Sequence, residues 1–369
     1  MSVSAVLRFV LSGFLLCVTW ASAQVAVVDL AALGYKQPES KPAVLAIQPG
    51  MLTIGVDGIT IVGFVTRRHT GHLATRDNPP FAFEVLRLAR DGKLIDRRAF
   101  PTERLSENAF YSGSDGKLLV RTGLDLRLLS RDLETIAERK LSWTQQSTGI
   151  HWGVIPFLDR SAFVLYDYGR DESTAELVSL DDLHVMKRCA RNPFNEPTSA
   201  LHDYLLAMLP SPARDPLLRT AQVSEICGPV RYSYRWKGDP VDATLVSDDA
   251  MVLAGTAPVV KLVRHNEVIW QDSFDHHSEV ALEEVAESAN GGMVAIGVKR
   301  LAGGSDMFDI PRHLKSVKVV VYRGEDGSRL KAVQINPAPV STFSFALSPD
   351  GALLAIVADG RLELHPIHA

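Results

Sequence analysis

Two stretches of the sequence carry neighbouring histidines that could bind a metal or transfer protons. His69 and His72 are three residues apart, beside Arg67, Arg68 and Arg76. A zinc site needs three or four ligands, and no third ligand stands next to this pair. The stretch is therefore interpreted as a polar surface loop, and no metal site is predicted.

A second polar stretch is the run Asp275-His276-His277. Its histidines could bind a metal or transfer protons near neutral pH, although an exposed connector between structural elements is the favoured interpretation. Arg312 and His313 add basic side chains in a later stretch.

His151 and His202 are the candidates for catalysis. His151 precedes Trp152, and His202 precedes Asp203. The sequence has no Gly-x-Ser-x-Gly elbow, His-Glu-x-x-His, Cys-x-x-Cys or glycine-rich phosphate loop. No catalytic residue is therefore predicted. The alternative is a hydrolase or lyase that uses His151, His202 and Asp203 at the mouth of a central channel, where the two histidines are expected on inner strands.

The composition is that of a folded globular protein. Of 369 residues, 46% are hydrophobic and 22% are charged, and the net charge is −4. These values exclude a disordered chain, a coiled coil and a collagen-like fibre. Since there is no basic excess to neutralise phosphates, a nucleic-acid partner is not expected.

Residues 1–23 have the features of a secretory signal peptide. Arg8 is their one charged residue, Phe9 to Val18 form an apolar run, and Ala21-Ser22-Ala23 supplies small residues for cleavage before Gln24. The run is about half the length that a membrane-spanning helix needs. We therefore expect a secreted protein, periplasmic or extracellular, with no integral membrane segment after cleavage.

Three cysteines are too few for a disulfide-built scaffold. In an oxidising compartment Cys189 and Cys227 could form one disulfide, and two buried free thiols are the alternative.

Apolar residues alternate with polar ones in several short stretches. Leu124, Leu126 and Leu128 show this pattern, and so do Val317, Val319 and Val321. A period of two is typical of half-buried strands, so the fold class is all-β.

The strands belong to a repeat marked by an Asp or Asn turn before a small apolar strand. The markers stand at positions 57, 115, 159, 203, 248, 290 and 350, with intervals of 58, 44, 44, 45, 42 and 60 residues. Four intervals match the period of a four-stranded propeller blade. Each unit also has a second turn later in its sequence, and the position of that turn places the extra length of the two long units between their second and third strands. The spacing predicts a seven-bladed β-propeller. A tandem pair of β-sandwiches is the alternative.

One propeller domain is expected over residues 24–369. A strand from residues 24–48, either Val25–Val28 or Val44–Ile47, is expected to close the ring with the last blade and so remove an exposed edge. The blades are expected near residues 49–102, 107–143, 147–190, 197–238, 242–275, 278–337 and 341–369.

The last blade carries a recognisable motif. Ser348-Pro349-Asp350-Gly351, followed by Leu353-Leu354-Ala355 and Gly360-Arg361-Leu362-Glu363-Leu364, resembles the WD40-like or TolB-type (PD40-like) propeller repeats of secreted bacterial proteins. The resemblance covers about thirty residues. It implies the fold and transfers no catalytic residue. The tryptophans do not recur in one register, so a quinone cofactor is not expected, and no cofactor is predicted.

The two insertions, Arg67 to Pro80 and Lys299 to Lys315, are expected on the same side of the ring as the blade-to-blade connectors. Loops on a rigid scaffold commonly carry binding residues, although both insertions could be decorative. We therefore expect a non-catalytic propeller that binds a protein, peptide or glycan on this side. The expected ligand-binding residues are Arg67, Arg68, His69, His72, Arg76, Trp152, Asp275, His276, His277, Arg312 and His313.

Overall fold

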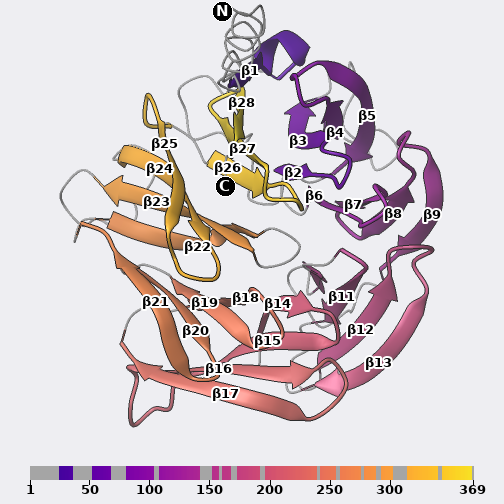
Figure 1. Ribbon diagram of the computed structural model, residues 1–369. Helices are drawn as coiled ribbons and strands as arrows, with labels where there is room; N and C mark the ends of the chain where they lie inside the picture. Colours follow the sequence, from indigo (N-terminus) through magenta and orange to yellow (C-terminus); the bar gives the residue numbers. More distant parts are fainter. Residues whose placement is uncertain are drawn as a thin grey trace, which may run out of the picture.

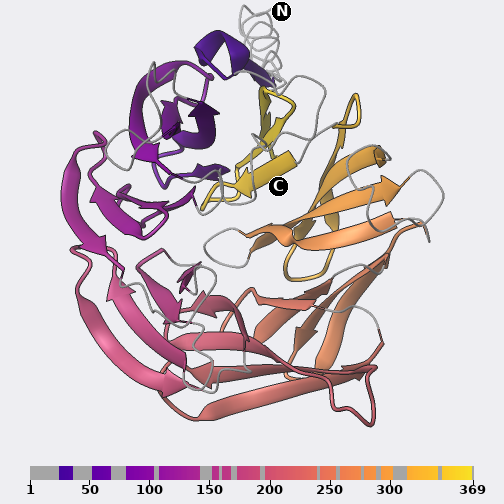
Figure 2. The ribbon, with the colours of Figure 1, turned by 180° about the vertical axis from the view of Figure 1, so that it is seen from behind.

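A computed structural model describes the chain over most of its length. The described residues are 25–35, 52–67, 80–103, 108–141, 152–157, 160–167, 173–191, 196–238, 242–254, 258–275, 278–287, 292–301, 314–339 and 343–367. They form seven four-stranded antiparallel sheets arranged in a ring (Figures 1 and 2). The fold is thus a seven-bladed β-propeller, and the tandem-sandwich alternative is excluded.

The blades follow one another along the chain, and in blades 1 to 6 the first strand is innermost and the fourth outermost. Blades 1 to 3 comprise β2 (Leu52–Ile54), β3 (Thr60–Arg67), β4 (Phe81–Leu88), β5 (Leu94–Thr102); β6 (Asn108–Ser112), β7 (Leu118–Thr122), β8 (Asp125–Leu129), β9 (Thr135–Lys140); and β10 (Trp152–Pro156), β11 (Ala162–Asp167), β12 (Ser173–Ser179), β13 (Val185–Arg191). Blades 4 to 6 comprise β14 (Glu196–Leu201), β15 (Tyr204–Leu209), β16 (Leu218–Glu225), β17 (Val230–Lys237); β18 (Asp242–Leu245), β19 (Ala250–Ala254), β20 (Val259–Arg264), β21 (Glu267–Ser273); and β22 (Ser278–Glu287), β23 (Met293–Leu301), β24 (Leu314–Arg323), β25 (Arg329–Ile335).

The seventh blade combines the two ends of the described chain. It comprises β26 (Phe343–Leu347), β27 (Leu353–Ala358), β28 (Arg361–Pro366) and, outermost, β1 (Ala26–Asp29). β1 pairs with β28 from Ala26↔Leu364 to Asp29↔Arg361. The ring is therefore closed by an N-terminal strand, as the sequence predicts. The other strand considered for this role, Val44–Ile47, lies outside the described residues.

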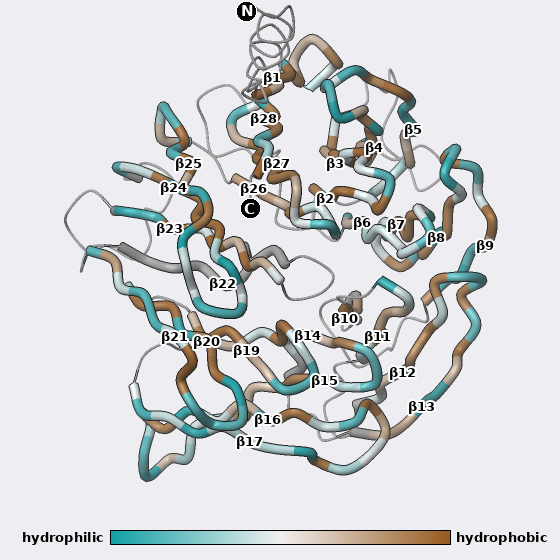
Figure 3. Tube along the Cα trace, viewed as in Figure 1, coloured by the Kyte–Doolittle hydropathy of each residue, from teal (hydrophilic) through white to brown (hydrophobic). Residues whose placement is uncertain are grey.

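The ring has two faces that differ in their connections. The hairpin face carries the turns between first and second strands and between third and fourth strands. The insertion face carries the connections between second and third strands and the connectors between blades. Figure 3 shows hydrophilic residues concentrated in the turns and hydrophobic residues along the strands. In the described part of the chain, no helix is long and apolar enough to cross a membrane.

The Asp markers that the structure describes, at positions 57, 115, 203, 248 and 350, lie in the first hairpin of their blades. Oδ1 of Asp57 accepts the backbone N–H of Ile59 at 3.0 Å, and Oδ1 of Asp350 accepts that of Ala352 at 3.0 Å. The glycine after each of these aspartates has a positive φ, 75° at Gly58 and 71° at Gly351. A side chain that satisfies the local backbone, followed by a residue free to adopt the left-handed region, makes these turns tight. The regular spacing of the markers in the sequence is thus the spacing of these turns.

A second repeated feature is a β-bulge where the outermost strand begins. In blades 1 to 6 the ladder between third and fourth strands shifts by one residue, as between Arg87 and Leu88. In each of these outer strands, one residue therefore has no opposite residue on the third strand. These residues are Ile95, Ile136, Met186, Arg231, Ile269 and Leu330. Five are aliphatic, and Arg231 in blade 4 is the exception.

The core lies between neighbouring blades. For example, Val164 and Leu177 of blade 3 belong to one buried cluster with Ala200 and Leu205 of blade 4. Buried polar groups also join blades: the carboxylate of Glu176 in blade 3 is 2% exposed and pairs with Arg139 of blade 2 and with Arg188 of its own blade. Each blade is thus held by its neighbours as well as by its own hydrogen bonds.

Candidate functional site

The two predicted insertions start and end on the insertion face. The first joins β3 to β4 in blade 1, and its flanking residues Arg67 and Phe81 are a pair in the ladder. The second joins β23 to β24 in blade 6, where Leu301 pairs with Leu314. Blade 7 lies between these two blades, because its inner strand β26 contacts both β2 and β22. The insertions therefore leave the ring on either side of blade 7.

The chain that leaves β1 begins in the same sector. Leu30 donates its N–H to the carbonyl oxygen of Gly360, at 2.8 Å, in the turn between the second and third strands of blade 7. Tyr35 packs beside it, 2% exposed, with its ring edge-on to that of Phe64 in blade 1 at 5.3 Å. Burial, and next the charge of Asp359, raise the pKa of the Tyr35 phenol. Residues 30–35 thus pack against both blade 7 and blade 1 on the insertion face.

Three of the predicted ligand-binding residues are described, and all three lie on the insertion face. Arg67 ends β3 and Trp152 begins β10. Asp275 follows β21, and its exposed carboxylate forms a 3.0 Å ion pair with Arg300. The other residues of the predicted set lie outside the described residues, as does the catalytic candidate His151: Arg68, His69, His72, Arg76, His276, His277, Arg312 and His313.

The remaining catalytic candidates, His202 and Asp203, lie on the hairpin face. They form the turn between β14 and β15, so His202 is not on the inner strand where the sequence placed it. Nδ1 of His202 lies 2.7 Å from Oδ1 of Asp248, whereas Asp203 pairs with Lys187 at 3.4 Å. The two residues therefore have different partners. Among the described residues, no group of three or more His, Cys, Asp or Glu side chains is arranged to hold a metal.

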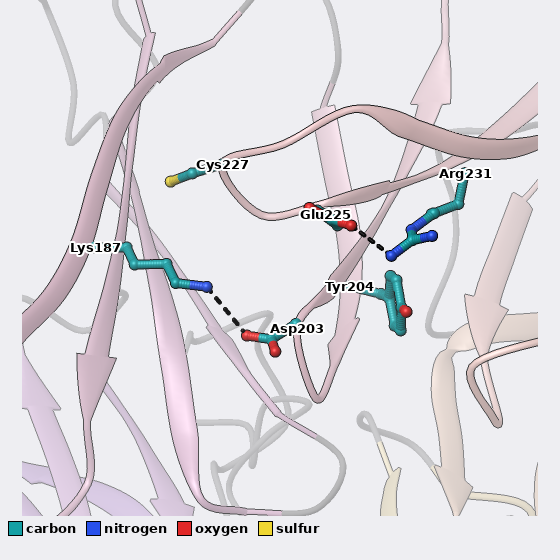
Figure 4. A pocket seen from close by; sticks show the side chains of 6 residues that line it. All are labelled: Lys187, Asp203, Tyr204, Glu225, Cys227 and Arg231. Atoms are coloured by element: carbon teal, nitrogen blue, oxygen red, sulfur yellow. Dashed lines mark hydrogen bonds and ion pairs between the residues drawn. The ribbon is translucent and has the colours of Figure 1, made fainter.

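A polar cavity of about 290 Å³ lies on the hairpin face between blades 3 and 4 (Figure 4). Its walls come from β13, the turn between β14 and β15, and the turn between β16 and β17 with its flanking residues. The lining side chains are Lys187, Asp203, Tyr204, Glu225, Cys227 and Arg231.

The charges in this cavity are balanced. Arg231 pairs with Glu225 at 2.6 Å and lies over the ring of Tyr204, 5.7 Å from its centroid. On the opposite side Lys187 reaches Asp203, as Figure 4 shows. These side chains are more than a third exposed, so each pair contributes little to stability. Two cations and two anions at one opening can instead bind a ligand that carries both charges.

One wall of the cavity is a disulfide. Cys189 on β13 is bonded to Cys227 in the turn between β16 and β17, with 5.6 Å between their Cα atoms. The bond ties the outer strand of blade 3 to blade 4. Of the two states that the sequence left open for these cysteines, the structure has the disulfide.

Four lining residues were missed from the sequence: Lys187, Tyr204, Glu225 and Arg231. Arg231 could have been identified by comparing the blades, because it occupies the bulge position that is aliphatic in the other five bulged blades. This difference becomes visible once the register of each ladder is known.

Comparison with known proteins supports the fold. No family model matches the chain, and no curated protein sequence matches it. A chain of the mitotic checkpoint complex crystal structure is similar over 93% of this chain and 95% of its own length, with 11% identity and a TM-score of 0.54. Hydrazine synthase from Kuenenia stuttgartiensis is similar over 90% and 99%, with 13% identity and a TM-score of 0.51. Hsv2 from Kluyvelomyces marxianus matches over 70% and 72%, with 12% identity and a TM-score of 0.46. The class of the protein is thus a seven-bladed β-propeller. The likeness to the first two structures, at 11% and 13% identity, concerns the fold alone.

Proposed function

We propose that this protein is a secreted, non-catalytic β-propeller that binds a protein, peptide or glycan ligand through its insertion face. The observation that carries the proposal is the position of the two insertions. They are far apart in the sequence, yet their flanking strands leave the ring on the same face, on either side of blade 7. Extra chain length on one sector of a rigid scaffold is typical of a binding surface.

Short connections in two other blades support the proposal, although blade 4 joins its second and third strands through residues 210–217. In blade 2 the second and third strands are joined by Gly123-Leu124, and in blade 7 by Asp359-Gly360. Two residues therefore suffice for this connection, and the longer ones in blades 1 and 6 are not required to build a blade. The first insertion has a basic excess, with Arg67, Arg68 and Arg76 against the single acidic residue Asp77, which favours an anionic ligand surface, such as an acidic peptide or a charged glycan.

Secretion is supported by the signal-like residues 1–23 and by the Cys189–Cys227 disulfide, because structural disulfides are typical of oxidising compartments. The enzyme alternative loses support because His202 and Asp203 have separate partners on the opposite face. N-terminal sequencing of the exported protein tests the compartment: a mature chain that begins at Gln24 is expected.

The binding function is tested with peptide and glycan arrays, probed with three versions of the full chain. In one variant, residues 302–313 are replaced by Asp-Gly, the connection that blade 7 uses. The second carries Arg67→Glu and Arg68→Glu. A control carries Arg235→Glu on the outer strand of blade 4. We expect the first two variants to lose the wild-type array signals and the control to keep them. Signals that survive both changes on the insertion face contradict the proposal.

A further inference from the structure

The cavity between blades 3 and 4 combines a disulfide with charged side chains of both signs. Its two sulfur atoms are in unequal surroundings. Cys227 is exposed and lines the cavity, whereas Cys189 is half-buried and packs against the apolar cluster between the two blades. An incoming nucleophile therefore reaches Sγ of Cys227 more easily than Sγ of Cys189.

The charges define which molecules fit. Each cation of the cavity is already paired with an anion, Arg231 with Glu225 and Lys187 with Asp203. A ligand with a single charge would leave one member of a pair without its partner, which is unfavourable. A ligand with both an ammonium and a carboxylate exchanges one ion pair for another and leaves no charge unmatched.

The repeat supports a special role for this cavity. The bulge residue of blades 1, 2, 3, 5 and 6 is Ile95, Ile136, Met186, Ile269 or Leu330. Blade 4 has Arg231 instead, and this residue lines the cavity. An aliphatic residue therefore fits the fold at this position. The blade does not require an arginine here, so we attribute Arg231 to binding in the cavity.

We propose that the Cys189–Cys227 disulfide is a site of thiol–disulfide exchange with small zwitterionic thiols. The incoming thiolate attacks Sγ of Cys227 and forms a mixed disulfide there. The bond between the two cysteines breaks, and its electron pair leaves on Sγ of Cys189, which takes a proton from water. The thiol is the one co-reactant, and no other oxidant or reductant is required. Lys187 and Arg231 hold the carboxylate of the thiol, and Asp203 and Glu225 hold its ammonium group.

The first test locates the adduct. The oxidised full-length protein is treated with L-cysteine, quenched with iodoacetamide, digested and analysed by mass spectrometry. We expect cysteine bound to Cys227 and carbamidomethyl on Cys189, in peptides that are distinct from the one containing Cys17. An adduct on Cys189, equal adducts on both residues, or no adduct overturns the proposal. This readout uses the unaltered protein, so it does not depend on how any variant folds.

The second test measures the role of the charges. Exchange rates with L-cysteine and with 2-mercaptoethanol, a neutral thiol, are compared in the wild type, in R231I and in the control R235I. R231I installs the residue found at the bulge in three other blades, so the native circular dichroism spectrum is expected. We expect the L-cysteine rate to fall about two- to fivefold in R231I and not in R235I. The 2-mercaptoethanol rate is expected to stay constant. Equal effects on both thiols, or no effect on either, overturn the assignment of the charged residues.

Discussion

The backbone N–H of Leu30 donates to the carbonyl oxygen of Gly360 at 2.8 Å, which joins the residue after the first described strand to the last turn of the ring. The side chain of Leu30 is fully buried in the cluster shared by blades 7, 1 and 2. The closure of the propeller therefore depends on packing as well as on the ladder between β1 and β28.

Leu30→Ala is expected to lower the free energy of unfolding by about 2–4 kcal/mol, because it removes buried methyl groups and leaves a cavity. Denaturation in guanidinium chloride measures the change. Val27→Ala is the matched control on the same segment, since Val27 is 57% exposed, and it is expected to cost less than about 0.5 kcal/mol. Similar losses of unfolding free energy in both variants would contradict a stabilising role for the burial of Leu30.

The buried carboxylate of Glu176 links blade 2 to blade 3 through Arg139. Glu176→Ala leaves the guanidinium groups of Arg139 and Arg188 without their anion, and we expect a loss of about 3 kcal/mol in the free energy of unfolding. Glu138→Ala removes a carboxylate that is 62% exposed and pairs with Arg127 at 3.3 Å. This control is expected to cost less than about 1 kcal/mol. Chemical denaturation at neutral pH distinguishes the two expected costs.

The disulfide closes a loop over a sequence separation of 38 residues. Replacing both cysteines, Cys189→Ala with Cys227→Ala, is expected to lower the free energy of unfolding by about 2–4 kcal/mol, mainly because the unfolded chain gains freedom. Adding dithiothreitol should lower the denaturation midpoint of the wild type and leave that of the double variant unchanged. A wild type that is insensitive to full reduction would show that the bond contributes no stability.

His365 links stability to pH. Its side chain is 8% exposed, and its Nε2 lies 3.0 Å from Oε2 of Glu363. Burial lowers the pKa of His365 below its ordinary value of 6.5; Glu363 opposes this shift and Lys331 adds to it. The unfolded chain therefore takes up a proton at a higher pH than the folded chain does. The free energy of unfolding is expected to decrease as the pH falls below about 6.5 towards the folded pKa.

His365→Gln tests this linkage, because glutamine does not titrate. The expected result is a smaller change in the urea midpoint between about pH 7.5 and pH 5 than in the wild type. The lowered pKa of Glu363 acts below its ordinary value of 4.5, outside this range. A variant with the same pH dependence as the wild type would show that His365 does not cause it.

The sequence predicted the architecture because its signal is local. An aspartate that accepts the N–H two residues later, as Asp57 does from Ile59, needs no distant partner, so its spacing along the chain reports the blade period. The strand alternation is local in the same sense. The closing strand is not, because it pairs Ala26 with Leu364, and it was inferred from the strand that the last blade lacks. The ring as a whole follows from counting such units.

The contacts between blades could not be predicted in this way. Arg139 and Glu176 are 37 residues apart, and the cavity at Arg231 gathers side chains from two blades. The local sequence pattern does not indicate which face of a strand packs against which neighbouring blade. His202 illustrates the limit: its place in the repeat was recognisable, but the sequence put it on a strand when it forms the turn that follows.

Photo-crosslinking tests the central proposal most directly. A photoreactive amino acid is placed at Met307, within the second insertion, and separately at Lys117, in a hairpin-face turn of blade 2. Each protein is exported and irradiated in its own compartment, and adducts are resolved by mass. The proposal predicts a discrete adduct from position 307 and none from position 117. Adducts from position 117 alone would contradict it, because they would place the ligand on the opposite face of the ring.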